Sequence, residues 1–251
     1  MQSSVKYELR GSTALILLNR PHRLNAVVPA LVDGLLDALG RAKADDARVV
    51  VLAGQGRAYC AGYDLKEPEP VETRDETRSR MQRLQDVTRR IVDFPGPVIS
   101  AVHGYALGAG AEFAFGSDIV VAGEDAVFGF PEVEVGLSVT GGITMLLPRA
   151  VGLVRAKELI LLGERFSAAR AHELGLVSRV VPAGAHLEAS LALADELAAR
   201  PATSLRLAKR ALDAGVDAAL AAALDREVDD VMVTLASGEN DEPAARFRDR
   251  S

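Results

Sequence analysis

The chain has 251 residues, with 49% hydrophobic and 25% charged residues and a formal net charge of −6. This composition suits one large globular domain, or one domain with a helical appendage, and its core is aliphatic because only 4% of residues are aromatic. The acidic balance and the lack of a long Lys/Arg run argue against a nucleic-acid partner. The single cysteine, Cys60, excludes an intrachain disulfide, and no apolar run reaches membrane-spanning length. We therefore expect a cytoplasmic protein without a membrane contact.

Apolar runs of strand length alternate with segments of helical periodicity through most of the chain. The run 47–53 is apolar almost throughout, which is typical of a strand buried on both faces of a parallel sheet. The leucines of 29–43 recur at helical spacing, and a polar helix over 76–94 is ended by Pro95-Gly96-Pro97. The expected strands are 5–9, 13–19, 47–53, 98–102, 118–122, 126–128 and 177–181.

The remainder of the chain is mostly helical. The expected helices are 29–43, 76–94, 111–116, 154–163, 167–174, 184–199, 202–214 and 216–235. Alternation of strands and helices implies parallel pairing with right-handed crossovers, so the fold class is α/β. From residue 184 onward only helices are expected. We therefore predict a core over 1–183 and a helical region for packing or assembly over 184–251.

One loop that can face a ligand is Arg57-Ala58-Tyr59-Cys60-Ala61-Gly62-Tyr63-Asp64-Leu65. It follows a buried strand, and ligands favour the carboxyl edge of parallel sheets. Gly62 permits a tight turn that leaves the next N–H groups able to face a ligand. Taken alone, the segment fits a simple strand-to-loop connection equally well.

A second segment is Gly104-x-x-x-Gly108-Ala109-Gly110-Ala111-Glu112, between a buried strand and a helix. Small residues let a ligand approach the backbone, and a helix start presents N–H donors. The glycine spacing does not fit G-x-G-x-x-G, which excludes a dinucleotide site of that kind. Close packing of helix on strand explains the glycines equally well.

A third segment, Phe128-Gly129-Phe130-Pro131-Glu132, places a carboxylate after an apolar strand. In a mostly apolar pocket the pKa of Glu132 would rise toward the range useful for proton transfer, although a lone loop glutamate is usually just solvated. No metal site is expected, because no Cys/His cluster exists and the histidines are scattered. They are His22, His103, His172 and His186.

The ordered set of motifs resembles the enoyl-CoA hydratase/isomerase (crotonase) family over roughly residues 5 to 236. The three segments above carry this resemblance, together with shorter matches in the same order. These matches are Asn19-Arg20-Pro21, Leu24-Asn25-Ala26, the run 97–104, Ser117-Asp118-Ile119, Gly141-Gly142, Gly152 with Ala156, and Gly175-Leu176-Val177. The resemblance implies a crotonase-like spiral of ββα units with a helical C-terminal trimerisation region.

The resemblance also implies which residues act. Two backbone N–H groups, those of Tyr63 and Ala109, would form an oxyanion hole for the thioester carbonyl of an acyl-CoA. Glu112 would mainly hold the water, and Glu132 would exchange a proton at C2. The implied contacts to coenzyme A are Arg23, Ala61, Asp64 and Leu65, with Arg23 equally well explained as a solvated surface arginine. No cofactor is implied beyond the coenzyme A of the substrate.

Three departures from the family pattern bear on these roles. Ala109 stands where glycine is usual, although alanine keeps the N–H donor. The stretch Gly136 to Gly142 lacks the commoner Pro-Gly pair and looks one residue shorter, which predicts an acyl group that differs from the usual one. The C-terminus keeps only a trace of the usual ending, which puts a coenzyme A contact from a neighbouring subunit in doubt.

The expected activity is trans-2-enoyl-CoA hydratase, which adds water across C2–C3. A Δ3–Δ2-enoyl-CoA isomerase, or another enolate reaction of the family, is the alternative, because isomerisation can run on Glu132 alone. A non-catalytic binding protein of this fold has little need for both carboxylates. The resemblance and the helical tail predict a homotrimer or a dimer of trimers.

Overall fold

The computed structural model describes residues 3–68 and 71–213, together with positions 228, 229, 232, 236 and 245. Most of the helix expected over 216–235 lies outside the described residues. The strands are β1 (Val5–Arg10), β2 (Thr13–Leu18), β3 (Val49–Gly54), β4 (Val98–Val102), β5 (Tyr105–Leu107), β6 (Ile119–Gly123), β7 (Val127–Gly129), β8 (Phe166–Ser167) and β9 (Arg179–Val181).

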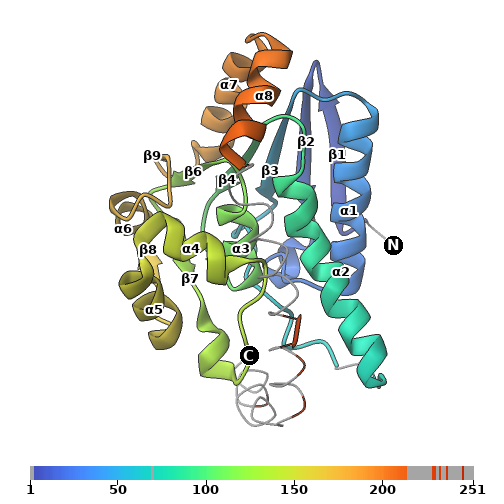
Figure 1. Cartoon of the computed structure of the whole chain (residues 1–251), viewed down its shortest axis with the longest axis vertical. Helices are drawn as coiled ribbons and strands as arrows, with labels where there is room; N and C mark the ends of the chain where they lie inside the picture. The colour runs from blue at the N-terminus through green and yellow to red at the C-terminus, as the bar shows by residue number, and fades with distance from the viewer. Residues whose placement is uncertain are drawn as a thin grey trace.

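Through the first half of the chain, each α-helix follows one or two strands (Figure 1). The α-helices are α1 (Pro29–Ala44), α2 (Arg74–Val92), α3 (Ala109–Phe115), α4 (Ile143–Val151), α5 (Leu153–Leu162), α6 (Ala168–Glu173), α7 (His186–Ala198) and α8 (Ala202–Asp213). The described residues also form two short 3-10 helices, η1 (Pro21–Arg23) and η2 (Pro131–Val135). Within the described residues, no helix is both long enough and apolar enough to cross a bilayer.

Two sheets organise the molecule. The larger has six strands in the order β1-β2-β3-β4-β6-β9, with β1 antiparallel to β2 and every later pair parallel. The smaller has the order β5-β7-β8. The parallel pairing expected from the alternation of strands and helices is confirmed, and strand after strand ends at the same edge of the large sheet.

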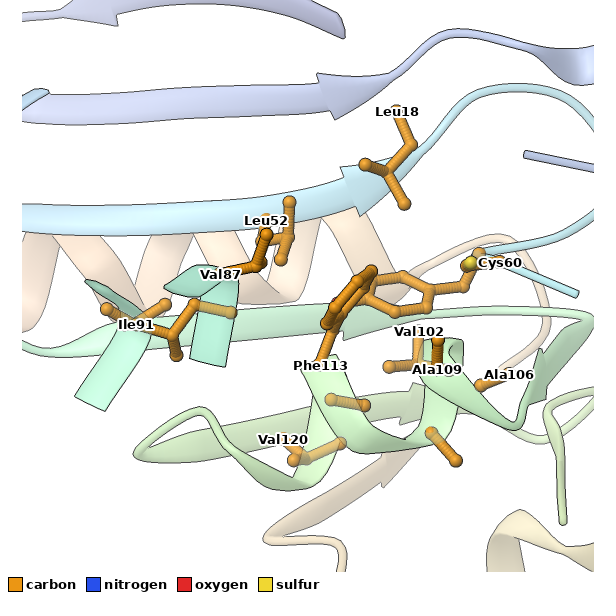
Figure 2. Packing of buried hydrophobic residues seen from close by; sticks show 14 of the residues in the cluster. Leu18, Leu52, Cys60, Val87, Ile91, Val102, Ala106, Ala109, Phe113 and Val120 are labelled. Atoms are coloured by element: carbon orange, nitrogen blue, oxygen red, sulfur yellow. The ribbon is translucent and has the colours of Figure 1, made fainter. Parts of the chain in front are cut away.

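The large sheet is covered on both faces, which explains its apolar strands. Along β3, Val50 and Leu52 face the core beneath α1, α2 and α3, whereas Val49 and Val51 face the core that includes Leu193 of α7. Figure 2 shows side chains of the first core converging between β3, α2 and α3. A strand buried on both faces needs apolar side chains at every position, which is the pattern of 49–53.

The helix α7 belongs to the region predicted to serve packing or assembly, yet it lies on the large sheet. It contacts β3, β4 and β6, with Ala194 fully buried (Figure 1). The first helix after residue 184 therefore completes the sheet's second face. The boundary at 184 itself stays a prediction.

Several elements differ from the predicted ones for identifiable physical reasons. The helix α2 begins at Arg74 because Thr73 and Glu76 form a reciprocal capping box. The helix α3 begins at Ala109, directly after Gly108, whose positive φ of 51° turns the chain. The helix α4 was not expected, and it contains Pro148 in its last turn. The strands β5 and β8 were not expected because they are defined by pairing with β7.

Candidate active site

The first two sequence segments lie side by side at the carboxyl edge of the large sheet. Cys60 forms a parallel bridge with Ala106, in which the Cys60 N–H donates to the Tyr105 carbonyl at 2.9 Å and the Cys60 carbonyl accepts from the Leu107 N–H at 3.0 Å. Gly62 follows against the Leu107 carbonyl, where a Cβ would come within 2.8 Å of the oxygen. Figure 2 shows Cys60, Ala106 and Ala109 in this region. Only glycine allows the two backbones to approach this closely.

The predicted oxyanion donors follow these paired segments. Tyr63 bridges Val27, whose N–H and carbonyl bond to Gly62 and Asp64, so the N–H of Tyr63 itself points away from Val27. Ala109 is the first residue of α3, and among the described residues no hydrogen bond uses its N–H. The structure therefore brings both predicted backbone donors to neighbouring segments.

Glu112 lies inside the molecule, on the first turn of α3. The residue is 1% exposed, and Thr140 donates to both of its carboxyl oxygens. The Thr140 N–H lies 2.7 Å from Oε1, and the Thr140 hydroxyl lies 2.7 Å from Oε2. A buried carboxylate needs such donors because it has lost its water.

The turn that carries Thr140 is fixed by α2. The buried Gln85 side chain accepts a 2.7 Å hydrogen bond from the Gly141 N–H. Gly141 has a φ of 61°, and a Cβ there would lie 2.6 Å from the Cβ of Glu112. Neither Thr140 nor Gln85 was among the predicted site residues. The only sequence signal for Thr140 was its place beside Gly141-Gly142, in the stretch that departs from the family pattern.

Glu132 comes from η2, and its carboxyl group approaches the start of α3. One of its oxygens, Oε1, lies 2.7 Å from the position that a Cβ on Gly108 would occupy. The other, Oε2, is buried with no hydrogen-bond partner among the described residues. Desolvation by burial raises the pKa of Glu132 to about 7, against an opposing backbone hydrogen bond. The third sequence segment thus meets the second at Gly108.

The two glutamates differ in surroundings although both adjoin the same turn. The Glu112 N–H bonds to the Gly108 carbonyl at 3.0 Å, while the Glu132 carboxyl faces Gly108 from outside the helix. Glu112 has donors on both oxygens, and Glu132 has a buried oxygen without one. Two carboxyls in different environments are suited to separate acid and base roles.

The residues predicted to contact coenzyme A surround a buried ion-pair network. Asp64 bonds to Arg20 Nη1 at 3.0 Å and to Arg23 through two bonds, the shorter at 2.9 Å. Arg20 also donates to the Ala26 carbonyl, and its place in the Asn19-Arg20-Pro21 motif did not predict either contact. Because Asp64 is 5% exposed and doubly paired, its charge is compensated.

The other two residues predicted to contact coenzyme A, Ala61 and Leu65, lie on the same loop as Asp64. The Ala61 N–H donates to the Leu24 carbonyl, and the Leu65 N–H donates to the Tyr63 carbonyl, both at 3.0 Å. Ala61 and Leu65 are partly exposed on the loop that carries Tyr63. Their contact with coenzyme A stays a prediction, as does that of Asp64. Within the parts of the chain that the structure describes, no group of three or more His, Cys, Asp or Glu side chains could hold a metal ion.

Comparison with known proteins identifies the family of the chain. A family model described as enoyl-CoA hydratase/isomerase matches residues 8–250. The 2,3-dehydroadipyl-CoA hydratase of Escherichia coli K12 is 40% identical over 217 residues, covering 85% of this chain and 83% of the relative. The 1,2-epoxyphenylacetyl-CoA isomerase of the same organism is 38% identical over 218 residues, covering 85% of this chain and 83% of the relative.

A solved structure supports the same assignment. The enoyl-CoA hydratase from Mycobacterium avium subsp. paratuberculosis K-10 superposes with a TM-score of 0.89 at 32% identity, covering 98% of this chain and 96% of that one. The crotonase-like fold expected from the sequence is thereby confirmed. The chain belongs to the enoyl-CoA hydratase/isomerase family.

Proposed function

We propose that the protein is a trans-2-enoyl-CoA hydratase that forms a 3-hydroxyacyl-CoA. The observation that carries the proposal is the approach of the Glu132 carboxyl group to Gly108, directly before the turn of α3 that carries Ala109 and Glu112 and beside the Gly62-Tyr63 segment. Hydration needs one group to take a proton from water and another to give a proton to carbon. The site offers both.

The thioester carbonyl is the group that the two backbone donors would bind. As water adds to C3, negative charge accumulates on the carbonyl oxygen. The N–H groups of Tyr63 and Ala109, aimed at that oxygen, stabilise the enolate more than the ground state, and the start of α3 adds its dipole. Loss of one such donor typically lowers a rate by about 10²- to 10³-fold.

The proton transfers balance as follows. Glu112 accepts a proton from water as the water oxygen bonds to C3, and the C2–C3 π electrons move toward the thioester oxygen. The enolate then collapses, and protonated Glu132 delivers a proton to C2. Exchange with solvent removes the proton from Glu112 and returns one to Glu132. No further cofactor takes part, because coenzyme A belongs to the substrate.

The proposal is tested by following loss of the conjugated-thioester absorbance with crotonyl-CoA and longer trans-2-enoyl-CoAs. Turnover with at least one chain length, and a 3-hydroxyacyl-CoA as product, supports hydration. Absence of turnover across the panel contradicts it. The panel also defines the acyl group, which the altered stretch from Gly136 to Gly142 leaves open.

Isomerisation is the second candidate function, supported by the isomerase relative at 38% identity. It would use Glu132 alone, first to remove and then to return a proton along the acyl chain. A panel of 3-enoyl-CoAs, followed by the gain of conjugated-thioester absorbance, distinguishes it from hydration. A non-catalytic binding role would leave both panels unchanged.

For coenzyme A, we propose that Arg23 contacts a phosphate group. Asp64 holds the guanidinium by two bonds, and the side chain is 28% exposed, so it is oriented yet reachable. Arg23→Gln is expected to raise KM for crotonyl-CoA by about three- to tenfold with kcat little changed, since the contact is partly screened.

The matched control for Arg23 is Arg10→Gln, because Arg10 is an exposed arginine on β1 that pairs with Glu8. A truncated thioester without phosphates should be handled equally by wild type and Arg23→Gln. If KM for crotonyl-CoA is unchanged, or if both substrates are affected alike, Arg23 does not contact a phosphate.

We further propose that the protein acts in fatty-acid metabolism and resides in the cytoplasm.

We also propose that the chain assembles as a trimer or a dimer of trimers. Assembly is supported by the exposed apolar side chains on α5, which a partner subunit would cover; they are Leu153, Val154, Leu161 and Leu162. Light scattering is expected to give three or six times the chain mass of 26.5 kDa. A monomer at micromolar concentration would contradict this proposal.

A further inference from the structure

Thr140 binds the buried carboxyl group of Glu112 at both ends. Its N–H reaches Oε1 and its hydroxyl reaches Oε2, each at 2.7 Å. The pair spans 28 residues of sequence and joins the η2–α4 connection to α3. Two short bonds from one residue fix both the position and the plane of a carboxyl group.

The turn around Thr140 is itself rigidly held. The Gly141 N–H is bound by the buried Gln85 of α2, and the Ile143 N–H donates to the Thr140 carbonyl at 3.1 Å. Gly141 and Gly142 both have positive φ, at 61° and 72°, which glycine adopts without strain. Thr140 therefore meets Glu112 from a backbone that has little freedom to move.

In the part of the chain that the structure describes, the carboxyl group of Glu132 is not held at both oxygens by hydrogen bonds as that of Glu112 is. Among the described residues, nothing bonds to its buried Oε2. A carboxyl group whose two oxygens both accept hydrogen bonds is suited to hold a water molecule in one orientation. A carboxyl group with a buried oxygen that accepts no hydrogen bond is suited to gain and lose a proton. The two carboxyl groups are thus distinguished by a residue that contacts only one of them.

We propose that Thr140 is a positioning residue that orients Glu112 toward the attacking water and is not required for proton exchange at C2. This inference rests on the proposed hydratase function, and it adds a residue that determines which glutamate handles water. Thr140 acts through Glu112, so its loss should impair hydration and spare any reaction that needs Glu132 alone.

Two variants and two reactions separate positioning from structural damage. Thr140→Val removes the hydroxyl at nearly constant shape, and Thr140→Ser keeps it. Each variant is assayed for hydration of crotonyl-CoA and for deuterium uptake at C2 of butyryl-CoA, which involves no water addition. Thr88→Val is the matched control, since Thr88 is a buried threonine on α2 whose hydroxyl has no partner among the described residues.

Thr140→Val is expected to lower kcat for hydration by about 10- to 100-fold, the usual effect of losing a hydrogen bond to a charged group. Its C2 exchange should stay within about threefold of wild type, and Thr140→Ser and Thr88→Val should stay near wild type in both reactions. The inference is overturned if Thr140→Val hydrates at the wild-type rate, or if it loses both reactions equally. A wild type that exchanges at C2 but hydrates no enoyl-CoA would instead contradict the proposed function, before any variant is compared.

Discussion

Replacing Glu132 with glutamine is expected to lower the rate of hydration by about 10²- to 10⁴-fold, the usual contribution of a general acid. Glutamine has nearly the same shape and still fits beside Gly108, but it cannot deliver a proton to C2. Binding of the acyl-CoA should change little, because the thioester is held by backbone donors. Steady-state kinetics with the substrate identified by the panel measure kcat and KM separately.

The control for this variant is Glu134→Gln, two residues later on η2, where the side chain is exposed. It should hydrate at the wild-type rate. If Glu132→Gln retains most of its activity, Glu132 is not the group that protonates C2, and the assignment of roles is wrong.

The raised pKa of Glu132 gives the first prediction a pH dependence with a definite sign. Its pKa is about 7, so the group is protonated below that pH and ionised above it. As an acid in hydration, Glu132 must be protonated, and kcat/KM should fall as pH rises through about 7. As a base in isomerisation, it must be ionised, and the rate should rise over the same range. The direction of the profile therefore separates the two reactions.

The same shift affects stability, which provides a check on the pKa itself. Between the ordinary value of 4.5 and about 7, the folded state holds a proton that the unfolded state releases, so stability falls as pH rises. Glu132→Gln has no carboxyl group at this position and therefore does not lose stability in this way as pH rises. Its melting temperature should exceed that of wild type by more at pH 8 than at pH 5. An equal difference at both values would show that Glu132 titrates normally.

The second large effect is expected for Glu112→Gln, which should also lower hydration by about 10²- to 10⁴-fold because the amide cannot accept the proton of water. The fold should tolerate the change. The amide oxygen still accepts from the Thr140 N–H, and the Thr140 hydroxyl can turn to accept from the amide NH₂.

Exchange of deuterium at C2 of butyryl-CoA distinguishes the role of Glu112 from that of Glu132. We expect Glu112→Gln to retain this exchange and Glu132→Gln to lose it. Glu124→Gln, an exposed glutamate between β6 and β7, serves as the control in both assays. Retained hydration by Glu112→Gln would show that Glu112 is not the group that takes the proton from water.

Local sequence patterns predicted the elements that are long and strongly patterned. The double burial of β3 is visible in the unbroken apolar run of 49–53, because each face of the sheet needs its own apolar side chains. The strands β5 and β8 have three and two residues, and they exist only through pairing with β7. No local pattern distinguishes such strands from the turns around them.

The candidate site was predicted where motifs are contiguous and missed where contacts are remote. Tyr63, Ala109 and Glu112 lie in glycine-containing segments that the strands bring together, so their placement followed from the order of motifs. Thr140 meets Glu112 across 28 residues, and its role depends on a turn geometry that the sequence does not specify. Arg20 was missed for the same reason, since its partner Asp64 is 44 residues away.

The most direct test of the central claim is the fate of the oxygen of water. A trans-2-enoyl-CoA of the chain length selected by the panel is incubated with the enzyme in water labelled with heavy oxygen, and the products are analysed by mass spectrometry. We predict a 3-hydroxyacyl-CoA that carries the label at C3. A site that converts 3-enoyl-CoA to 2-enoyl-CoA and yields no labelled product from any trans-2-enoyl-CoA would contradict the hydratase account.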